Sequence, residues 1–206
     1  MASRLKKSAG LMAAAIALVG GWEGLRTVAY PDITGVPTVC FGETRGVKLG
    51  DRYTVDQCKV MLGDALVEFE TAMRRCLKAP DAVPDKPYTA FLSLSYNIGS
   101  GAFCGSTVAR RANAGDLRGA CEAIPMWNKA GGRVIKGLVN RRAEERQICL
   151  SGLASAAATP TAKPVAPAPN VETPAATDVP VGVIIGVGLA LAIGLAVILV
   201  RRRKKS

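Results

Sequence analysis

Residues 22–44 read WEGLRTVAYPDITGVPTVCFGET, and they decide what kind of domain this chain folds into. Pro31-Asp32 and Thr34-Gly35 are turn dipeptides with β-branched residues on both sides, so the stretch predicts a short β-hairpin. An apolar, helix-like segment precedes it. A helix end and a hairpin that meet in this way can form one wall of a cleft.

Two carboxyls and a hydroxyl in this stretch are the candidate catalytic groups. Glu23 follows Trp22 at the end of the apolar segment, where a partly dry carboxyl would have a raised pKa and could act as an acid. Asp32 lies in the turn and Thr38 in the next strand, on the other side of such a cleft. An inverting glycosidase separates its acid from its water-activating groups in this way. On spacing alone, surface groups and turn caps are the alternative.

The chain contains no histidine. This excludes Ser-His-Asp and Cys-His catalysis and the zinc sites that use histidine. Acid–base chemistry must therefore come from carboxylates, which favours glycosidases. We expect no metal site and no cofactor.

The chain is basic, with 27 Lys and Arg against 16 Asp and Glu and a net charge of +11. Such an excess attracts polyanions in general, including anionic lipid and the bacterial wall. No basic run is interleaved with aromatic residues, and five basic residues cluster at 201–205. We therefore do not expect a nucleic-acid partner.

All six cysteines lie in the middle of the chain, and none forms a CxxC pair. An even number of widely spaced cysteines favours disulfides and an oxidising compartment over a metal site. Fifteen pairings are open to six cysteines, and buried free thiols are the alternative. The candidates are Cys40, Cys58, Cys76, Cys104, Cys121 and Cys149.

Residues 22–152 predict a mainly helical domain with one small β region. Thr54 and Gln57 suit a helix cap at the start of a stretch from 55 to about 77. A second helix is expected after Pro87, ending at Gly99 and Gly101. Shorter helices are expected over 106–114, 117–124 and 139–150.

The C-terminal third predicts a membrane anchor. Residues 179–200 are uncharged and long enough to span a bilayer, and the basic residues of the tail at 201–206 favour a cytoplasmic end. Residues 153–178 are rich in Ala and Pro and predict a linker. The domain before the linker then lies outside the cytoplasmic membrane.

The N-terminal segment, 1–21, has two interpretations. Lys6 and Lys7 precede an apolar, Ala- and Gly-rich stretch, which is typical of a signal anchor. The same stretch could instead be the first helix of the domain, with Leu11, Ile16 and Leu18 packed inward beside Trp22. We favour the signal anchor, because a domain ahead of a C-terminal span needs an export signal.

Three blocks of this sequence together resemble the phage-type lysozymes of glycoside hydrolase family 24. Residues 22–44 carry the family's spacing of a Glu, eight residues, an Asp, five residues and a Thr; residues 92–121 and 127–150 continue the resemblance. The resemblance implies an α+β, mainly α, two-lobed fold with a small β-hairpin region. To it the sequence adds a C-terminal transmembrane helix.

The resemblance also implies roles for the candidate residues. Glu23 would be the general acid that protonates the glycosidic oxygen. Asp32 would orient the attacking water or stabilise the oxocarbenium-like transition state, and Thr38 would help to place the water. The bond implied is the β-1,4 link between N-acetylmuramic acid and N-acetylglucosamine.

Four further residues are candidates for binding substrate. Asn97, Ser106 and Thr107 could line the cleft, with capping of helix ends as the alternative. Arg141 is expected to pair with Glu23, with an ordinary surface arginine as the alternative.

The chain departs from the family pattern in two places. Cys40-Phe41-Gly42-Glu43 replaces a Gly-Tyr-Gly-His-like stretch and adds Glu43 near the cleft. The C-terminal linker and span are also unusual. Some family members carry an N-terminal signal anchor that keeps the enzyme idle at the membrane, and membrane insertion of that segment here would pull Glu23 out of place.

We therefore expect a monomeric endolysin muramidase with its catalytic domain in the periplasm of the host and with peptidoglycan and the cytoplasmic membrane as partners. A lytic transglycosylase is a second enzyme class on this fold. A membrane-anchored, non-catalytic wall-binding or lysis-accessory protein is the non-enzymatic alternative.

Overall fold

A computed structural model describes residues 2–154 of the chain. Nearly all of the predicted linker, together with the predicted span and the cytoplasmic tail, lies outside these residues. The described elements, in order, are α1 (Arg4–Lys7), α2 (Ala9–Glu23), β1 (Arg26–Pro31), β2 (Pro37–Cys40), α3 (Val55–Arg75), the 3-10 turn η1 (Pro80–Ala82), α4 (Asp85–Ile98), α5 (Ser100–Cys104), α6 (Thr107–Asn113), α7 (Leu117–Ala123), the 3-10 turn η2 (Ile124–Met126), β3 (Lys129–Ala130), β4 (Arg133–Val134) and α8 (Lys136–Ala154).

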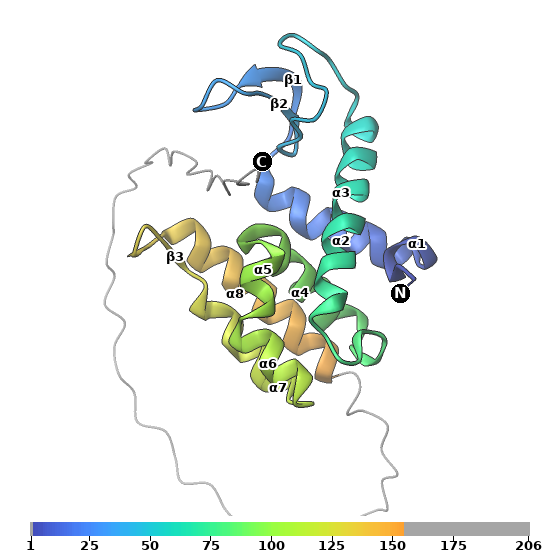
Figure 1. Ribbon diagram of the computed structural model, residues 1–206, viewed down its shortest axis with the longest axis vertical. Coiled ribbons are helices and arrows are strands. Elements are labelled where there is room, and N and C mark those ends of the chain that lie inside the picture. The colour runs from blue at the N-terminus through green and yellow to red at the C-terminus, as the bar shows by residue number, and fades with distance from the viewer. Residues whose placement is uncertain (1, 155–206) are drawn as a thin grey trace, which may run out of the picture. The chain divides into compact units, whose positions relative to one another are not determined.

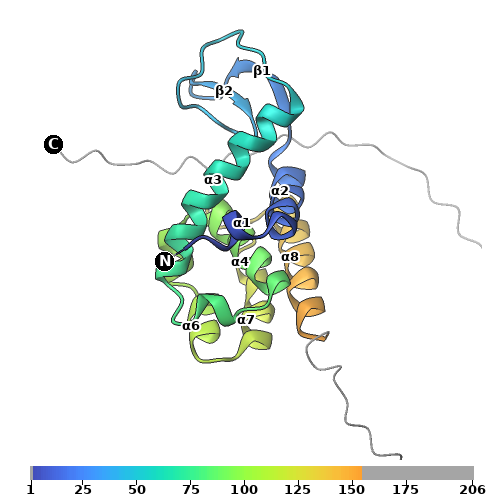
Figure 2. The same cartoon turned by 90° about the vertical axis from the view of Figure 1, so that its right-hand side faces the viewer.

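The described chain forms two lobes joined by two helices. In both views α3 runs from the β1–β2 hairpin to the helical lobe, and α2 leads from the helical lobe into the hairpin (Figures 1 and 2). The helices gather around α4, whose side chains are buried from Pro87 to Ser95. The mainly helical fold with a small hairpin region is therefore confirmed.

The sequence predicted most helix positions and fewer of their ends. A capping box of Thr54 and Gln57 starts α3, as expected. α8 is longer than predicted, and the short α5 was not predicted. The β3–β4 hairpin was also missed, although Gly131 and Gly132, with φ of 55° and 78°, supply its turn.

The N-terminal segment forms α1 and most of α2 in the helical lobe. Ser8 caps α2 by accepting a hydrogen bond from the Leu11 amide, and an Ala-rich sequence favours the helix. Leu11, Leu18 and Val19 are buried in the core. Among the described residues, no helix has both the length and the apolarity to cross a membrane. The structure shows the segment packed in the domain, and its membrane-inserted form stays a prediction.

A buried carboxylate holds the start of the chain. Glu70 of α3 accepts hydrogen bonds from the amides of Arg4 (2.8 Å) and Leu5 (3.3 Å), from the Ser3 hydroxyl, and from the Tyr88 hydroxyl (2.7 Å). The first amides of α1 have no partner within the helix, and this carboxylate accepts their hydrogen bonds. The start of the chain is therefore fixed to α3, next to Tyr88 of α4.

The β1–β2 hairpin has the predicted antiparallel pairing, with Tyr30 opposite Thr38. Its own small core contains Ala29, Val39 and the Cys40–Cys58 disulfide. Cys40 has a φ of 58°, in the left-handed region that favours glycine. The bridge to α3 therefore fixes a strained backbone position two residues after Thr38.

The six cysteines form three disulfides, and none is free. The expectation of disulfides is confirmed, and the alternative of buried free thiols is wrong. The pairs follow the order of the sequence: the first cysteine bonds to the second, the third to the fourth, and the fifth to the sixth. The bridges tie the hairpin to α3 (Cys40–Cys58), the end of α3 to α5 (Cys76–Cys104) and α7 to α8 (Cys121–Cys149).

We predict that Cys40→Ser/Cys58→Ser loosens the hairpin lobe selectively. Opening this loop, of sequence separation 18, should lower the free energy of unfolding by about 3 kcal/mol. Hydrogen exchange should accelerate at Ala29 and Val39, whose amides donate to Asp51 and Glu43. Cys121→Ser/Cys149→Ser is the control, with a similar loss of stability and unchanged hairpin protection. Equal acceleration in both variants would contradict the prediction.

Candidate active site

Glu23 is the last residue of α2 and stands where the helical lobe turns into the hairpin. Gly24, with a φ of 75°, ends the helix and redirects the chain into β1. The Glu23 side chain is 25% exposed, and its Oε1 accepts a hydrogen bond of 2.8 Å from Nη1 of Arg141. The sequence-predicted pair is thus present, and Arg141 is a buried residue of α8 rather than a surface arginine.

A second contact fixes the same end of α2. Nε1 of Trp22 donates a hydrogen bond of 2.7 Å to Oε2 of Glu144 on α8. Trp22 and Glu23 are neighbours in the chain, and both bind α8. The position of the Glu23 carboxyl is therefore set by two side-chain hydrogen bonds that tie the end of α2 to α8.

Asp32 lies in the hairpin turn, and its Oδ1 accepts three hydrogen bonds. The donors are the hydroxyl and amide of Thr34, at 2.7 and 2.8 Å, and the amide of Val36, at 2.9 Å. The Thr34 hydroxyl bond contributes most, followed by the Val36 amide bond, to holding the Asp32 pKa below its usual value. Asp32 is therefore ionised over a wide pH range, with Oδ2 free of these contacts.

Thr38 is almost fully buried on β2. Its hydroxyl donates to the Val36 carbonyl oxygen at 3.0 Å. Because the proton is used within the turn, the Thr38 oxygen is left as an acceptor. Asp32 and Thr38 thus share contacts to Val36, and both depend on the same turn.

Glu43, the additional acid, is tied to its own loop. Its carboxylate accepts hydrogen bonds from the Thr44 and Arg45 amides, and the Arg45 guanidinium pairs with both Glu43 and Glu68. Burial raises the pKa of Glu43, but the bonds from Arg45 and Thr44 outweigh it and leave the pKa lowered. Glu43 is therefore held as a carboxylate, which does not suit it to donate a proton.

The other three predicted binding residues make structural contacts. Ser106 caps α6 by accepting from the Ala109 amide at 3.0 Å, which is the capping alternative. The Thr107 hydroxyl accepts from Arg110 at 2.8 Å. Oδ1 of Asn97 accepts from Arg142 at 3.1 Å and so links the end of α4 to α8.

Sequence reasoning missed the residues that surround Arg141. Burial raises the pKa of Tyr96 to about 12, and the nearby charges of Glu23 and Glu43 add to this effect. Tyr96 thus lies within electrostatic reach of acids from both lobes. Its position beside Asn97, in a block that carried the family resemblance, was the only signal in the sequence.

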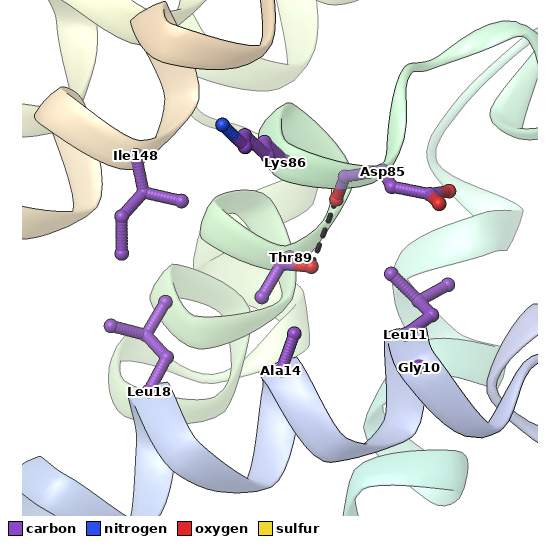
Figure 3. Close-up of a pocket in the computed structure, with 8 residues that line it drawn as sticks. All are labelled: Gly10, Leu11, Ala14, Leu18, Asp85, Lys86, Thr89 and Ile148. Carbon is purple, nitrogen blue, oxygen red and sulfur yellow. Dashed lines mark hydrogen bonds between the residues drawn. The ribbon is translucent and has the colours of Figure 1, made fainter.

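A separate apolar pocket of about 270 Å³ lies between α2, α4 and α8 (Figure 3). Its walls include Leu18, Ala14 and Ile148, which point into it. Thr89 also lines the pocket, and its hydroxyl donates a hydrogen bond of 2.8 Å to the Asp85 carbonyl oxygen. The pocket contains none of the predicted catalytic groups, so it is distinct from the site around Glu23.

Comparisons with known proteins show the family of this chain. The family described as phage lysozyme matches residues 20–145. The SAR-endolysin of Pseudomonas phage phiKMV is 42% identical over 143 residues, covering 68% of this chain and 88% of that protein. The SAR-endolysin of Enterobacteria phage P21 is 41% identical over 133 residues, covering 64% of this chain and 79% of that protein. The active form of P1 phage endolysin Lyz superposes with a TM-score of 0.61 at 28% identity, over 68% of this chain and 84% of that one.

We predict that Thr34→Val raises the pKa of Asp32. The substitution removes the hydroxyl bond that contributes most to the lowered pKa while keeping the shape of the side chain. A carbon-13 NMR titration of the Asp32 carboxyl measures the change. Thr34→Ser keeps the hydroxyl and serves as control, with a midpoint close to that of the parent. An unchanged midpoint in Thr34→Val would show that the backbone amides alone set this pKa.

Proposed function

The chain belongs to the phage lysozyme family, and we propose that Glu23, Asp32 and Thr38 are its catalytic groups. The protein is a glycoside hydrolase, an endolysin muramidase that degrades peptidoglycan in host-cell lysis. It cleaves the β-1,4 bond between N-acetylmuramic acid and N-acetylglucosamine. All three proposed groups come from one chain, in keeping with a monomer.

Glu23 acts as the general acid in this proposal. Protonated Glu23 gives its proton to the glycosidic oxygen as the bond to the leaving sugar breaks. The carboxylate left behind is stabilised by Arg141, whose Nη1 already contacts Oε1 at 2.8 Å. Partial exposure of the side chain leaves room for the sugar.

Asp32 and Thr38 act on the opposite side of the bond. The carboxylate of Asp32 stays ionised and can stabilise positive charge on the sugar ring or orient a water molecule. The Thr38 oxygen can accept a hydrogen bond from that water. One proton of the water passes to the Asp32 carboxylate and the hydroxyl bonds to the sugar carbon, while the leaving sugar carries the proton from Glu23.

The observation that carries this proposal is the contrast between the two carboxyls. Glu23 is partly shielded at a helix end and contacts one buried arginine, whereas Asp32 is locked as an anion by its turn. Acid–base catalysis by two carboxyls needs different environments of this kind.

We predict that Glu23→Gln lowers the rate of peptidoglycan hydrolysis at least about 100-fold, because the amide cannot supply the proton. The measurement is release of reducing ends from purified peptidoglycan, with detection of anhydro ends to reveal a transglycosylase. Glu43→Gln is the matched control, since that acid is held in its own loop, and it should stay within a few-fold of the parent. If Glu23→Gln keeps full activity, the proposed acid is wrong.

Membrane attachment is the second part of the proposal. We infer that residues 1–21 serve as a signal anchor before α2 packs into the domain, and its relatives from phages phiKMV and P21 are named SAR-endolysins. Residues 9–22 include no charged side chain. In the bilayer, Trp22 and Glu23 could not reach Glu144 and Arg141, so the acid would be out of place.

The C-terminal stretch supports a further attachment. We propose from the sequence that residues 179–200 span the cytoplasmic membrane, with the basic tail at 201–206 inside and the catalytic domain in the periplasm. The linker of residues 153–178 would then separate the domain from the membrane surface. Release of the N-terminal segment would still leave such an enzyme tethered.

We predict that Ala13→Leu/Ala17→Leu keeps the enzyme at the membrane and delays lysis. Both alanines are exposed on α2, so larger apolar side chains strengthen insertion without disturbing the core. Ala13→Ser/Ala17→Ser is the control, with earlier lysis. Fractionation of the full chain and of a chain ending at Ala154 separates the two anchors. Undelayed lysis by the leucine variant would contradict the N-terminal anchor.

A further inference from the structure

A cluster of buried charges lies directly behind the proposed acid. Arg141, Arg142 and Glu145 of α8 are all buried: Arg141 is 4% exposed, and the other two are 0% exposed. Glu145 and Arg142 contact α4, against which α8 packs, and Arg141 contacts Glu23 at the end of α2. Buried charges cost free energy unless they are paired, so their presence beside Glu23 calls for a physical explanation.

Glu145 is the centre of this cluster. Its Oε1 accepts hydrogen bonds from Ser93 Oγ at 2.6 Å, from Arg142 Nη2 at 3.1 Å and from Arg141 Nε at 3.2 Å. Its Oε2 lies 2.9 Å from Arg142 Nε. One carboxylate therefore contacts both arginines.

Arg141 is a bridge between two carboxylates. Its Nε contacts Glu145 and its Nη1 contacts Glu23. A guanidinium is planar and rigid, so fixing Nε on Glu145 also fixes the direction in which Nη1 points. The buried Nη2 has no hydrogen-bond partner among the described residues, so the remaining contacts of the group are few.

The charges of the cluster balance when Glu23 is ionised. Two guanidiniums then face the carboxylates of Glu23 and Glu145. Burial lowers the pKa of Arg142 to about 10, while Glu145 and Glu23 act in the opposite direction, so Glu23 interacts with both arginines. Two uncompensated guanidiniums would hold the acid in its ionised form.

We propose that Glu145 is a positioning residue for the acid: its buried carboxylate aims Arg141 at Glu23 and offsets the positive charge that would otherwise strip Glu23 of its proton. The inference rests on the proposed role of Glu23 as the general acid. Burial raises the pKa of Glu145, with Arg142, Ser93 and Arg141 opposing it. These three contacts favour the ionised form that the offset needs.

Other polar groups near Glu23 and Glu145 are accounted for. From α4, Ser93 contacts Glu145, Asn97 contacts Arg142, and Tyr96 lies near Glu23. From the hairpin lobe, Glu43 is paired with Arg45. Two further acids near this face are engaged elsewhere, Glu122 with Arg146 and Glu144 with Trp22. Within the described chain, Glu145 is thus the acid that contacts both arginines.

The test is a set of pH–rate profiles for the full chain on soluble peptidoglycan oligomers. In Glu145→Gln, the pH above which kcat falls should move down by about one unit, because the pKa of the acid drops. At alkaline pH this shift corresponds to a kcat about tenfold lower than that of the parent. KM should change little, because Glu145 does not reach the cleft surface. An unchanged profile with only lower stability would overturn the proposal.

A buried carboxylate far from the site provides the matched control. Glu70 is also fully buried and also accepts from a hydroxyl, that of Tyr88. Glu70→Gln should lower stability but leave the pH profile unchanged. A shift as large as that of Glu145→Gln would assign the effect to general loosening of the fold and overturn the proposal.

A charge series keeps the proposal testable even if Glu145→Gln fails to fold. Arg142→Met should move the alkaline limb upward, and Arg142→Met/Glu145→Gln should return it toward the parent value. If the pH–rate profile of the double variant is identical to that of Arg142→Met, Glu145 has no effect on the acid and the proposal is wrong. Glu23→Gln, run alongside, tests the acid itself, so its retained activity would refute the proposed function separately from this inference.

Discussion

A hydrogen bond between Glu23 and Arg141 holds the proposed acid in place. It joins residues 118 positions apart, one at the end of α2 and one on α8. The proposed acid can lie in place only when the end of α2 has reached the side chains of α8. The hydrogen bond from Trp22 to Glu144 supports the same junction. Folding of the whole helical lobe is therefore a condition for a competent site, and partial structures without α2 have no positioned acid.

A buried arginine beside an acid creates an electrostatic difficulty that the helical lobe resolves with α4. Ser93 and Asn97 of that helix contact the charges of Glu145 and Arg142. Without such partners, two guanidiniums in the interior would cost several kcal/mol and would favour an ionised acid. The burial of α4 on most of its surface thus serves two purposes. It builds the apolar core, and it brings neutral hydrogen-bonding groups to the charges behind the site.

The composition of α2 suits two environments. Leu11 and Val19 fill the core, while the outward positions Ala13 and Ala17 are small and uncharged. A polar outer face would favour the packed helix and oppose membrane insertion, whereas large apolar residues there would favour insertion. Small uncharged residues allow both the inserted and the packed helix. The same helix that carries the acid can therefore be released into the domain, where the carboxylate of Glu70 holds the segment before it.

The local features of this protein could be predicted from its sequence. The hairpin, the spacing of Glu23, Asp32 and Thr38, and most helices follow from turn residues and periodicities within short stretches. Disulfide formation was also predictable, but the pairing was not, because it depends on which cysteines the fold brings together. Glu145 and its partners could not be found, since a charged residue on a helix is normally taken to face water. Their burial became visible with the packing of α8 on α4, because α4 supplies, from a distant part of the chain, the polar partners that make the burial of these charges tolerable.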